Sequence, residues 1–139
     1  MFLDENYLEM VVAKLNQVQS MGIEVHIDDF GTGYSPISYL RKLPVNCLKI
    51  DKYFVDALLD VDEDQIDTTA IPRAMITLGH GHKLSVLAEG VESIEQVRIL
   101  KGMGCDQAQG YYFSRPHPAD KLWAAVNAID ENWEKDPSE

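Results

Sequence analysis

Cysteine is scarce in this sequence: Cys47 and Cys105 are the only two in 139 residues. Two cysteines are too few for a disulfide-stapled scaffold, so we expect two reduced thiols, as in cytoplasmic proteins. Long apolar runs are also missing, since none approaches the roughly 20 residues that a membrane-spanning helix needs. The first residues lack the basic stretch and apolar core of a secretory signal. The sequence therefore predicts a cytoplasmic protein with no membrane segment.

Positive charge is in short supply as well. Lys and Arg number 12 against 23 Asp and Glu, which gives a net charge of −11. A surface this negative repels phosphate backbones, so nonspecific nucleic-acid binding is not expected. The hydrophobic share of 45% and the charged share of 25% are typical of globular proteins, which excludes a disordered tail. We expect one domain over residues 1–139.

Helical and strand patterns alternate along the chain. Apolar residues at helical spacing predict a helix around Leu8–Val18 and another over about 118–133. Between them, short apolar segments predict four strands, near residues 23–29, 47–51, 84–89 and 108–113. Strands that alternate with helices are typical of βαβ units, so we expect an α/β fold with four parallel strands and flanking helices.

Two local patterns concern the connections. Ser93 and Gln96 have the spacing of a capping box, which predicts a helix that starts there and ends near Gly104. An acidic connection is expected over about 59–69. Pro72, with the glycines that follow it, predicts a shortened helix after that connection.

Polar residues gather where the expected strands end. Because the carboxyl ends of parallel strands meet at one edge of a sheet, these side chains are expected to converge. A single Asp at such a place is usually a cap or a solvated charge, but four strand ends with polar groups favour a site. The residues concerned are Asp28, Asp29, Lys49, Asp51, Glu89 and Gln109.

Carboxylates at this edge suit hard metal ions. Asp28, Asp51 and Glu89 share the phase of one sheet face, and their oxygens favour Mg²⁺ or Mn²⁺. A metal pair can activate water against a phosphodiester, and Lys49 could position that water or neutralise developing charge. The segment Gly31-Thr32-Gly33 supplies a flexible loop after the Asp pair, although one G-x-G is weak evidence of phosphate binding.

Four short motifs follow the expected strands. They are Asp28-Asp29-Phe30-Gly31-Thr32-Gly33-Tyr34-Ser35, Leu48-Lys49-Ile50-Asp51, Ala88-Glu89-Gly90-Val91-Glu92 and Gln109-Gly110-Tyr111. Together these motifs resemble the EAL family, whose active members are cyclic di-GMP phosphodiesterases. They stand in the family's order, and the resemblance covers about residues 7–118.

The resemblance implies roles for the matching residues. Asp28 and Asp29 match metal ligands, Lys49 and Asp51 match residues that help to hold water and metal, and Glu89 matches the proposed general base. Gln109 matches a residue that contacts the site or substrate. Glu92 matches a residue of the loop tied to dimerisation and activation, which implies the same for the loop Gly31, Thr32, Gly33. The implied reaction cuts cyclic di-GMP to pGpG, with Mg²⁺ or Mn²⁺ as cofactor.

The resemblance also implies that half of the family domain is missing. That domain is a (β/α)8 TIM-like barrel of about 250 residues, and these motifs match only its last four strands. The Glu-Ala-Leu signature is absent, as are the third-strand asparagine and the fourth-strand glutamates, so the metal site is expected to be incomplete. Open edge strands expose backbone groups, so we expect dimerisation to complete the half-barrel.

Three functions follow from this interpretation. The first is an inactive, truncated EAL domain that dimerises and regulates another protein, such as an intact EAL protein. The second is a reader with weak affinity for metal and cyclic di-GMP. The third is a phosphodiesterase that is completed in trans by the missing first half.

Overall fold

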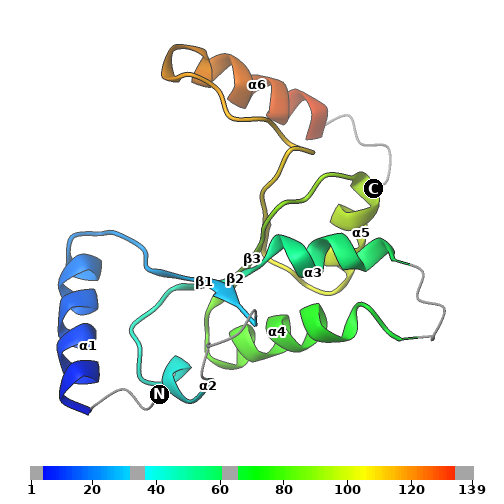
Figure 1. Cartoon of the computed structure of the whole chain (residues 1–139). Helices are drawn as coiled ribbons and strands as arrows, with labels where there is room; N and C mark the ends of the chain where they lie inside the picture. The colour runs from blue at the N-terminus through cyan, green and yellow to red at the C-terminus, as the bar shows by residue number, and fades with distance from the viewer. Residues whose placement is uncertain (1–4, 32–36, 61–65, 134–139) are drawn as a thin grey trace.

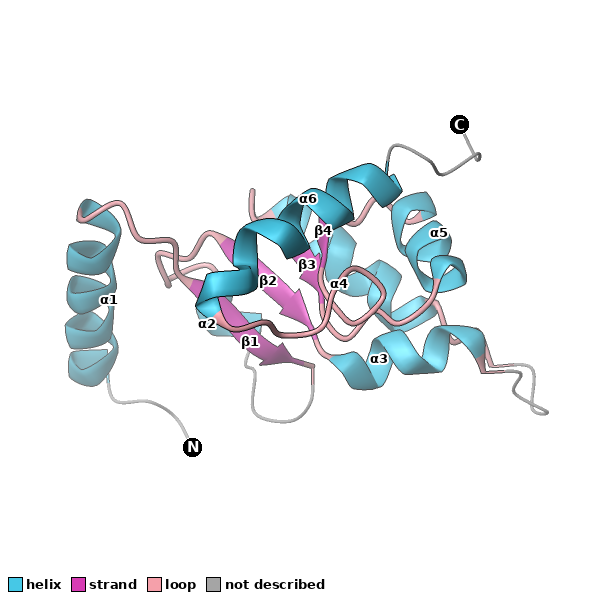
Figure 2. Cartoon of the chain, turned by 90° about the horizontal axis from the view of Figure 1, so that it is seen from above, coloured by secondary structure: helices cyan, strands magenta, loops and turns pink. Residues whose placement is uncertain are grey.

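A four-stranded parallel sheet lies at the centre of the chain in a computed structural model, which describes residues 5–31, 37–60 and 66–133 (Figure 1 and Figure 2). The spatial order of the strands is the same as their order in the sequence. The strands are β1 (His26–Phe30), β2 (Cys47–Ile50), β3 (Ser85–Ala88) and β4 (Gln107–Ala108). The predicted α/β class with four parallel strands and flanking helices is confirmed.

Helices connect the strands. They are α1 (Glu5–Ser20), α2 (Ile37–Leu40), α3 (Lys52–Asp56), α4 (Ala70–Gly81), α5 (Ile94–Gly102) and α6 (Leu122–Trp133), with 3-10 turns η1 (Ala57–Leu59) and η2 (Ala119–Lys121). Helix α4 packs against β2 and β3, whereas α1 and α6 stand apart from the strands at opposite ends of the chain (Figure 1).

The core lies around the two central strands. Leu48 and Ile50 of β2 and Val86 and Ala88 of β3 are fully buried, because neighbouring strands and helices cover them. The helices and loops contribute Phe54, Val55, Leu58, Met75, Ile76, Leu84, Val91, Val97 and Leu100 to the same cluster. The other positions of these strands are covered too, since Cys47 is buried and Lys49, Ser85 and Leu87 are half-buried, as is typical of central parallel strands. This cluster fixes the strands whose ends carry the candidate site.

Strand β4 is much shorter than the sequence predicts. It pairs with β3 only through Leu87↔Gln107 and Ala88↔Ala108, and the chain turns at Gly110. The expected strand over 108–113 is therefore wrong, because the chain leaves the sheet to contact Val91. Likewise β1 begins three residues later than expected, at His26.

The helix after the acidic connection is longer than the sequence predicts. Helix α4 runs for 12 residues through Pro72 and Gly79, so the expected shortening is wrong. Pro72 lies in the first turn, where a missing N–H breaks no helical hydrogen bond. Gly79 faces β3, and a Cβ there would come within 2.6 Å of Val86 Cγ2. The acidic connection itself lies partly outside the described residues.

The predicted capping box is confirmed at the start of α5. The Gln96 N–H donates to Ser93 Oγ at 3.2 Å, and the Ser93 N–H donates to Gln96 Oε1 at 3.1 Å. The same Oε1 also accepts from the Glu92 N–H at 2.8 Å, and Gln96 Nε2 donates to the Val55 carbonyl at 3.2 Å. Buried Gln96 thus ties the loop after β3 to the core.

A polar contact joins α4 to the start of β4. Asp106 Oδ2 lies 2.9 Å from His80 Nε2 and accepts from the Val86 N–H at 2.7 Å. Burial raises the pKa of the Asp106 carboxyl, but the bonds from His80 and Val86 outweigh it and hold the pKa below its usual range. Asp106 is 41% exposed, so solvent screens part of this effect.

We expect Asp106→Ala to lower the free energy of unfolding at pH 7 by about 1–2 kcal/mol, because Val86 N–H would lose its partner. Because the pKa of Asp106 is lowered in the folded chain, its carboxylate stabilises the fold above the unfolded pKa, and this stabilisation is lost as pH falls through the folded pKa. The difference in unfolding free energy between the parent chain and the variant should therefore shrink below about pH 4. Urea unfolding at pH 7 and pH 3.5 measures both. An equal loss in Asp120→Ala, on the surface turn η2, would contradict the assignment.

No helix in the described ranges is long and apolar enough to cross a membrane.

Candidate functional site

Four side chains from four strand ends form one line of polar contacts. Lys49 Nζ, on β2, lies 3.2 Å from Asp28 Oδ1 on β1 and 2.5 Å from Glu89 Oε1, directly after β3. Gln109, directly after β4, donates from Nε2 to the same Glu89 oxygen at 2.8 Å. The expected convergence at the carboxyl edge of the sheet is therefore present for these four residues.

The backbone of the sheet explains this alignment. The ladder continues one residue past the strands, since the Glu89 N–H donates to the Ile50 carbonyl at 3.0 Å and the Gln109 N–H to the Ala88 carbonyl at 2.9 Å. Lys49 pairs with Leu87 across β2 and β3. Backbone hydrogen bonds of the sheet thus hold Glu89 and Gln109 beside Lys49.

Asp28 and Asp29 lie at an irregularity in β1. The register of β1 with β2 shifts between Ile27 and Phe30, and Asp29 has φ of 50°, in the left-handed region. Its N–H donates to Asp28 Oδ1 at 3.0 Å, which is a contact that helps Asp adopt this conformation. Both aspartates are exposed, whereas strict alternation would place them on opposite faces.

Charge pairing divides the carboxylates of the site. The Lys49 ammonium lowers the pKa of Asp28, chiefly through their hydrogen bond. The pKa of Lys49 is in turn raised, mainly by its hydrogen bond to Glu89, despite the opposing effect of burial. The pKa of Asp29 is raised by the negative charge of Asp28, then by burial and by Asp51. The positive charge of Lys49 thus balances the carboxylates of Asp28 and Glu89, whereas the carboxylates of Asp29 and Asp51 repel each other.

Asp51 also stabilises the start of the helix that follows it. Its Oδ1 accepts from the Tyr53 N–H at 2.8 Å, so it caps the N-terminus of α3. This use of Asp51 fixes the start of α3 directly behind the β2 strand end. No separate pattern in the sequence indicates this cap, because an Asp that caps a helix and an Asp that serves a site can occupy the same position after a strand.

Sequence reasoning missed Lys52. Its Nζ lies 2.7 Å from Asp56 and 2.9 Å from Glu92, so it links the helix after β2 to the loop after β3. These two carboxylates, Asp56 first, raise the pKa of Lys52. The Lys52–Asp56 spacing of four residues is a signal for one contact, but nothing local in the sequence indicates Glu92.

The glycine loop after β1 is only partly described. Thr32 and Gly33 lie outside the described residues. Gly31 has φ of 93°, and a Cβ there would lie 3.2 Å from the Phe54 ring, so glycine suits this position. Gly31, the residue after β1, therefore lies close to the Phe54 ring of α3.

The donor chemistry suits Mg²⁺ or Mn²⁺, but the arrangement does not supply a full set of ligands. Within residues 5–31, 37–60 and 66–133, no group of three or more His, Cys, Asp or Glu side chains is placed to hold a metal ion. Lys49 lies between Asp28 and Glu89, where it balances their charge.

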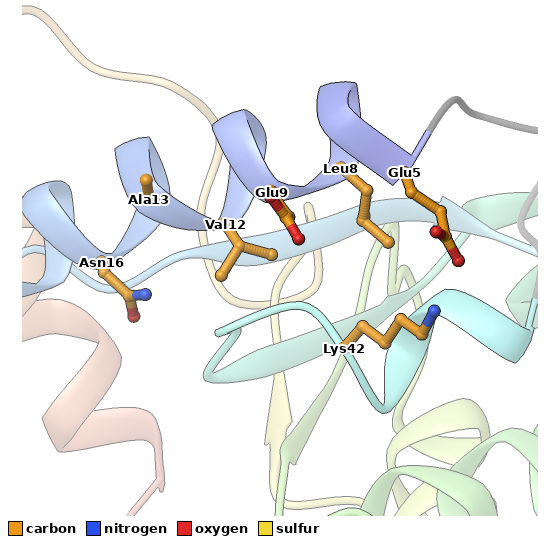
Figure 3. A pocket seen from close by; sticks show the side chains of 7 residues that line it. All are labelled: Glu5, Leu8, Glu9, Val12, Ala13, Asn16 and Lys42. Carbon is orange, nitrogen blue, oxygen red and sulfur yellow. The ribbon is translucent and has the colours of Figure 1, made fainter.

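A groove lies away from these strand ends (Figure 3). It has a volume of about 460 Å³ between α1 and Lys42. Leu8, Val12 and Ala13 form its apolar part, and Glu5, Glu9, Asn16 and Lys42 line the rest. None of the strand-end residues lines it.

Comparison with known families gives one clear result. The sequence model of the EAL domain family matches residues 3–116 of this chain. The bifunctional diguanylate cyclase/cyclic di-GMP phosphodiesterase MucR of Pseudomonas aeruginosa is 43% identical over 112 residues, which is 81% of this chain and 16% of MucR. The cyclic di-GMP phosphodiesterase NbdA of the same organism is 40% identical over 115 residues, which is 83% of this chain and 14% of NbdA.

Solved structures show the same similarity. The PaMucR phosphodiesterase in its c-di-GMP complex has a TM-score of 0.72 at 41% identity, over 82% of this chain and 44% of that one. The EAL domain of Mycobacterium smegmatis DcpA has a TM-score of 0.76 at 37% identity, over 87% of this chain and 52% of that one. The chain thus spans about half of these solved chains, and its fold is part of their TIM barrel.

Proposed function

The chain belongs to the EAL domain family, and from this premise we propose that the 139-residue polypeptide is a non-catalytic relative of the cyclic di-GMP phosphodiesterases that acts by associating with protein. Its first partner is a second copy of itself, and an intact EAL protein is a further one. The residues of the strand ends keep the family's motifs, but they act in the folding and recognition of the half-domain.

One observation carries the proposal. Among the described residues the strand ends form a lysine-bridged carboxylate pair and no three-ligand group for a metal. EAL phosphodiesterases rely on a divalent metal, and a hydrolytic site needs that metal to activate water. With Asp28 and Glu89 held by Lys49, the remaining Asp29 and Asp51 supply too few ligands.

The roles proposed for individual residues follow the family motifs. Asp28, Asp29 and Asp51 are the metal-facing carboxylates, Glu89 and Lys49 stand at the catalytic positions, and Gln109 at the substrate position. Glu92 and the loop Gly31, Thr32, Gly33 stand at the dimerisation positions. In an assembly that adds the missing ligands, such as one with the first half of a barrel, these residues would complete a phosphodiesterase.

A second candidate function is a weak reader of cyclic di-GMP. The observation that favours it is the pair of donors, Lys49 and Gln109, at the same strand-end edge. An ammonium and an amide N–H are suitable partners for a phosphodiester oxygen. The solved PaMucR phosphodiesterase and a standalone EAL protein of Vibrio cholerae both have c-di-GMP bound, and they cover 82% and 85% of this chain.

An assay for pGpG tests the proposal. The purified chain with Mg²⁺ or Mn²⁺ and cyclic di-GMP is expected to form pGpG at least about a thousandfold more slowly than an intact EAL phosphodiesterase. The matched variants are Glu89→Gln, at the strand-end edge, and Glu95→Gln, in the first turn of α5. Robust hydrolysis that Glu89→Gln abolishes and Glu95→Gln retains would overturn the proposal.

A further inference from the structure

The loop after β3, residues 89–92, carries the site residue Glu89 at its first position. It continues through Gly90, which has φ of 69°, in the left-handed region. The Glu89 carboxylate accepts from Gln109 Nε2 at 2.8 Å and pairs with Lys49 Nζ. The backbone path of this loop therefore decides whether the carboxylate reaches both partners.

The hydrocarbon stem of Lys52 lies directly on this loop. A Cβ at Gly90 would overlap Cβ, Cγ and Cδ of Lys52, and these are the three atoms nearest to it. Lysine stems commonly pack in this way while the ammonium keeps its contact with water. The residue that follows Glu89 is thus covered by a side chain of α3.

The ammonium of Lys52 holds the stem in this place. Nζ lies 2.9 Å from Glu92 Oε1, at the last position of the loop, and 2.7 Å from Asp56 Oδ1 on α3. All three side chains are half-exposed, so each ion pair alone contributes little to stability. Their effect is geometric, because the two carboxylates hold the stem across Gly90.

Other contacts hold the later part of the loop. The Val91 N–H donates to the Gln109 carbonyl at 3.0 Å, and the Glu92 N–H donates to Gln96 Oε1 at 2.8 Å. These bonds tie the loop to the end of β4 and to α5. The contact of Lys52 lies closer to the start of the loop and ties it to α3, which follows β2.

We infer that Lys52 is a positioning residue of the strand-end site: by holding the loop after β3 against α3, it keeps the Glu89 carboxylate in the line of polar contacts across the strand ends. Its stem sets the position of Gly90, and the backbone of Gly90 sets the direction in which the Glu89 side chain leaves the sheet. This role goes beyond the proposed function, because it concerns one copy of the chain and does not depend on association with protein.

Exchange of the Gln109 carboxamide protons with water tests this role in the whole chain. One of these protons bonds to Glu89, so NMR follows the contact itself rather than the stability of the fold. We expect Lys52→Ala to speed this exchange at least about threefold, because the Glu89 carboxylate then spends time out of reach. Lys52→Arg keeps a long stem and a cation, so it should retain the parent rate. Glu89→Ala supplies the reference rate for a lost contact.

Two controls separate positioning from a general loss of structure. Lys101→Ala removes an exposed lysine at the end of α5 and should leave the exchange of Gln109 unchanged. The backbone amides of Leu48 and Val86, in the buried strands, should keep their parent rates in Lys52→Ala. Parent-like exchange of Gln109 in Lys52→Ala would overturn the inference. An equal rise at the two backbone amides or in Lys101→Ala would overturn it as well.

Glu92→Gln tests the path through the ion pair. It removes the charge that holds Lys52 on the side of the loop, so alone it should speed the Gln109 exchange in the same direction as Lys52→Ala. In the Lys52→Ala background it should add nothing, because the two residues act as one unit. Additive effects of the two substitutions would show that Glu92 and Lys52 act separately, and would overturn the inference.

Discussion

Replacing Gly110 with alanine is expected to lower the free energy of unfolding by more than about 3 kcal/mol. Gly110 has φ of 156°, and a Cβ there would overlap the backbone N and O of Val91. These atoms cannot move away, because the Val91 N–H donates to the Gln109 carbonyl at 3.0 Å and the Tyr112 N–H donates to the Val91 carbonyl at 3.0 Å. Val91 itself is fully buried.

Gly102→Ala is the control for this prediction. Gly102 ends α5, and a Cβ there would meet no atom within 4 Å. Alanine at a helix position without a clash is expected to be neutral or to stabilise by a few tenths of a kcal/mol. Urea unfolding of both variants at pH 7 measures the difference. Equal stability of the two variants would contradict the close contact between the strand-end turn and Val91.

Lys49→Met should remove the cation that joins three strand ends. Lys49 and Glu89 are only 18% and 19% exposed, so the lost pairing leaves Glu89 near Asp28 in a poorly solvated place. We expect the free energy of unfolding at pH 7 to fall by about 1–2 kcal/mol, less than for a fully buried pair. Lys14→Met, on the exposed face of α1, should cost little.

The loss in Lys49→Met should depend on pH in a defined way. In the parent chain the pKa of Asp28 is lowered, so its contribution exists above the unfolded pKa and is lost as pH falls through the folded pKa. The pKa of Lys49 is raised, so its contribution is lost only as pH rises through that folded pKa. The difference between parent and variant should therefore be level from about pH 5 to 9 and shrink below about pH 4. A difference that grows on acidification would contradict this account.

The sequence predicted the central sheet well because its signals there are local. The short apolar segments around Leu48 and Val86, which alternate with helical patterns, indicate parallel strands, and Ser93 with Gln96 indicates a capped helix start. The four strand-end residues Asp28, Lys49, Glu89 and Gln109 follow from the strand positions alone. Their roles in binding or catalysis remain predictions.

Other features depend on contacts between distant residues, which periodicity does not encode. The shift at Asp29 overrides strict alternation, because the left-handed conformation re-aims the side chain. Strand β4 ends early because Gly110 packs onto Val91. The partners Lys52 and Glu92 are 40 residues apart, and no spacing rule joins them.

Sedimentation of the purified chain over a wide concentration range tests the central claim, self-association of this chain, most directly. The chain has a mass of 15.7 kDa, and the account predicts that the measured mass rises to twice this value at micromolar concentration and stays there. A mass of 15.7 kDa at every concentration, from a chain that is folded by circular dichroism, would contradict it.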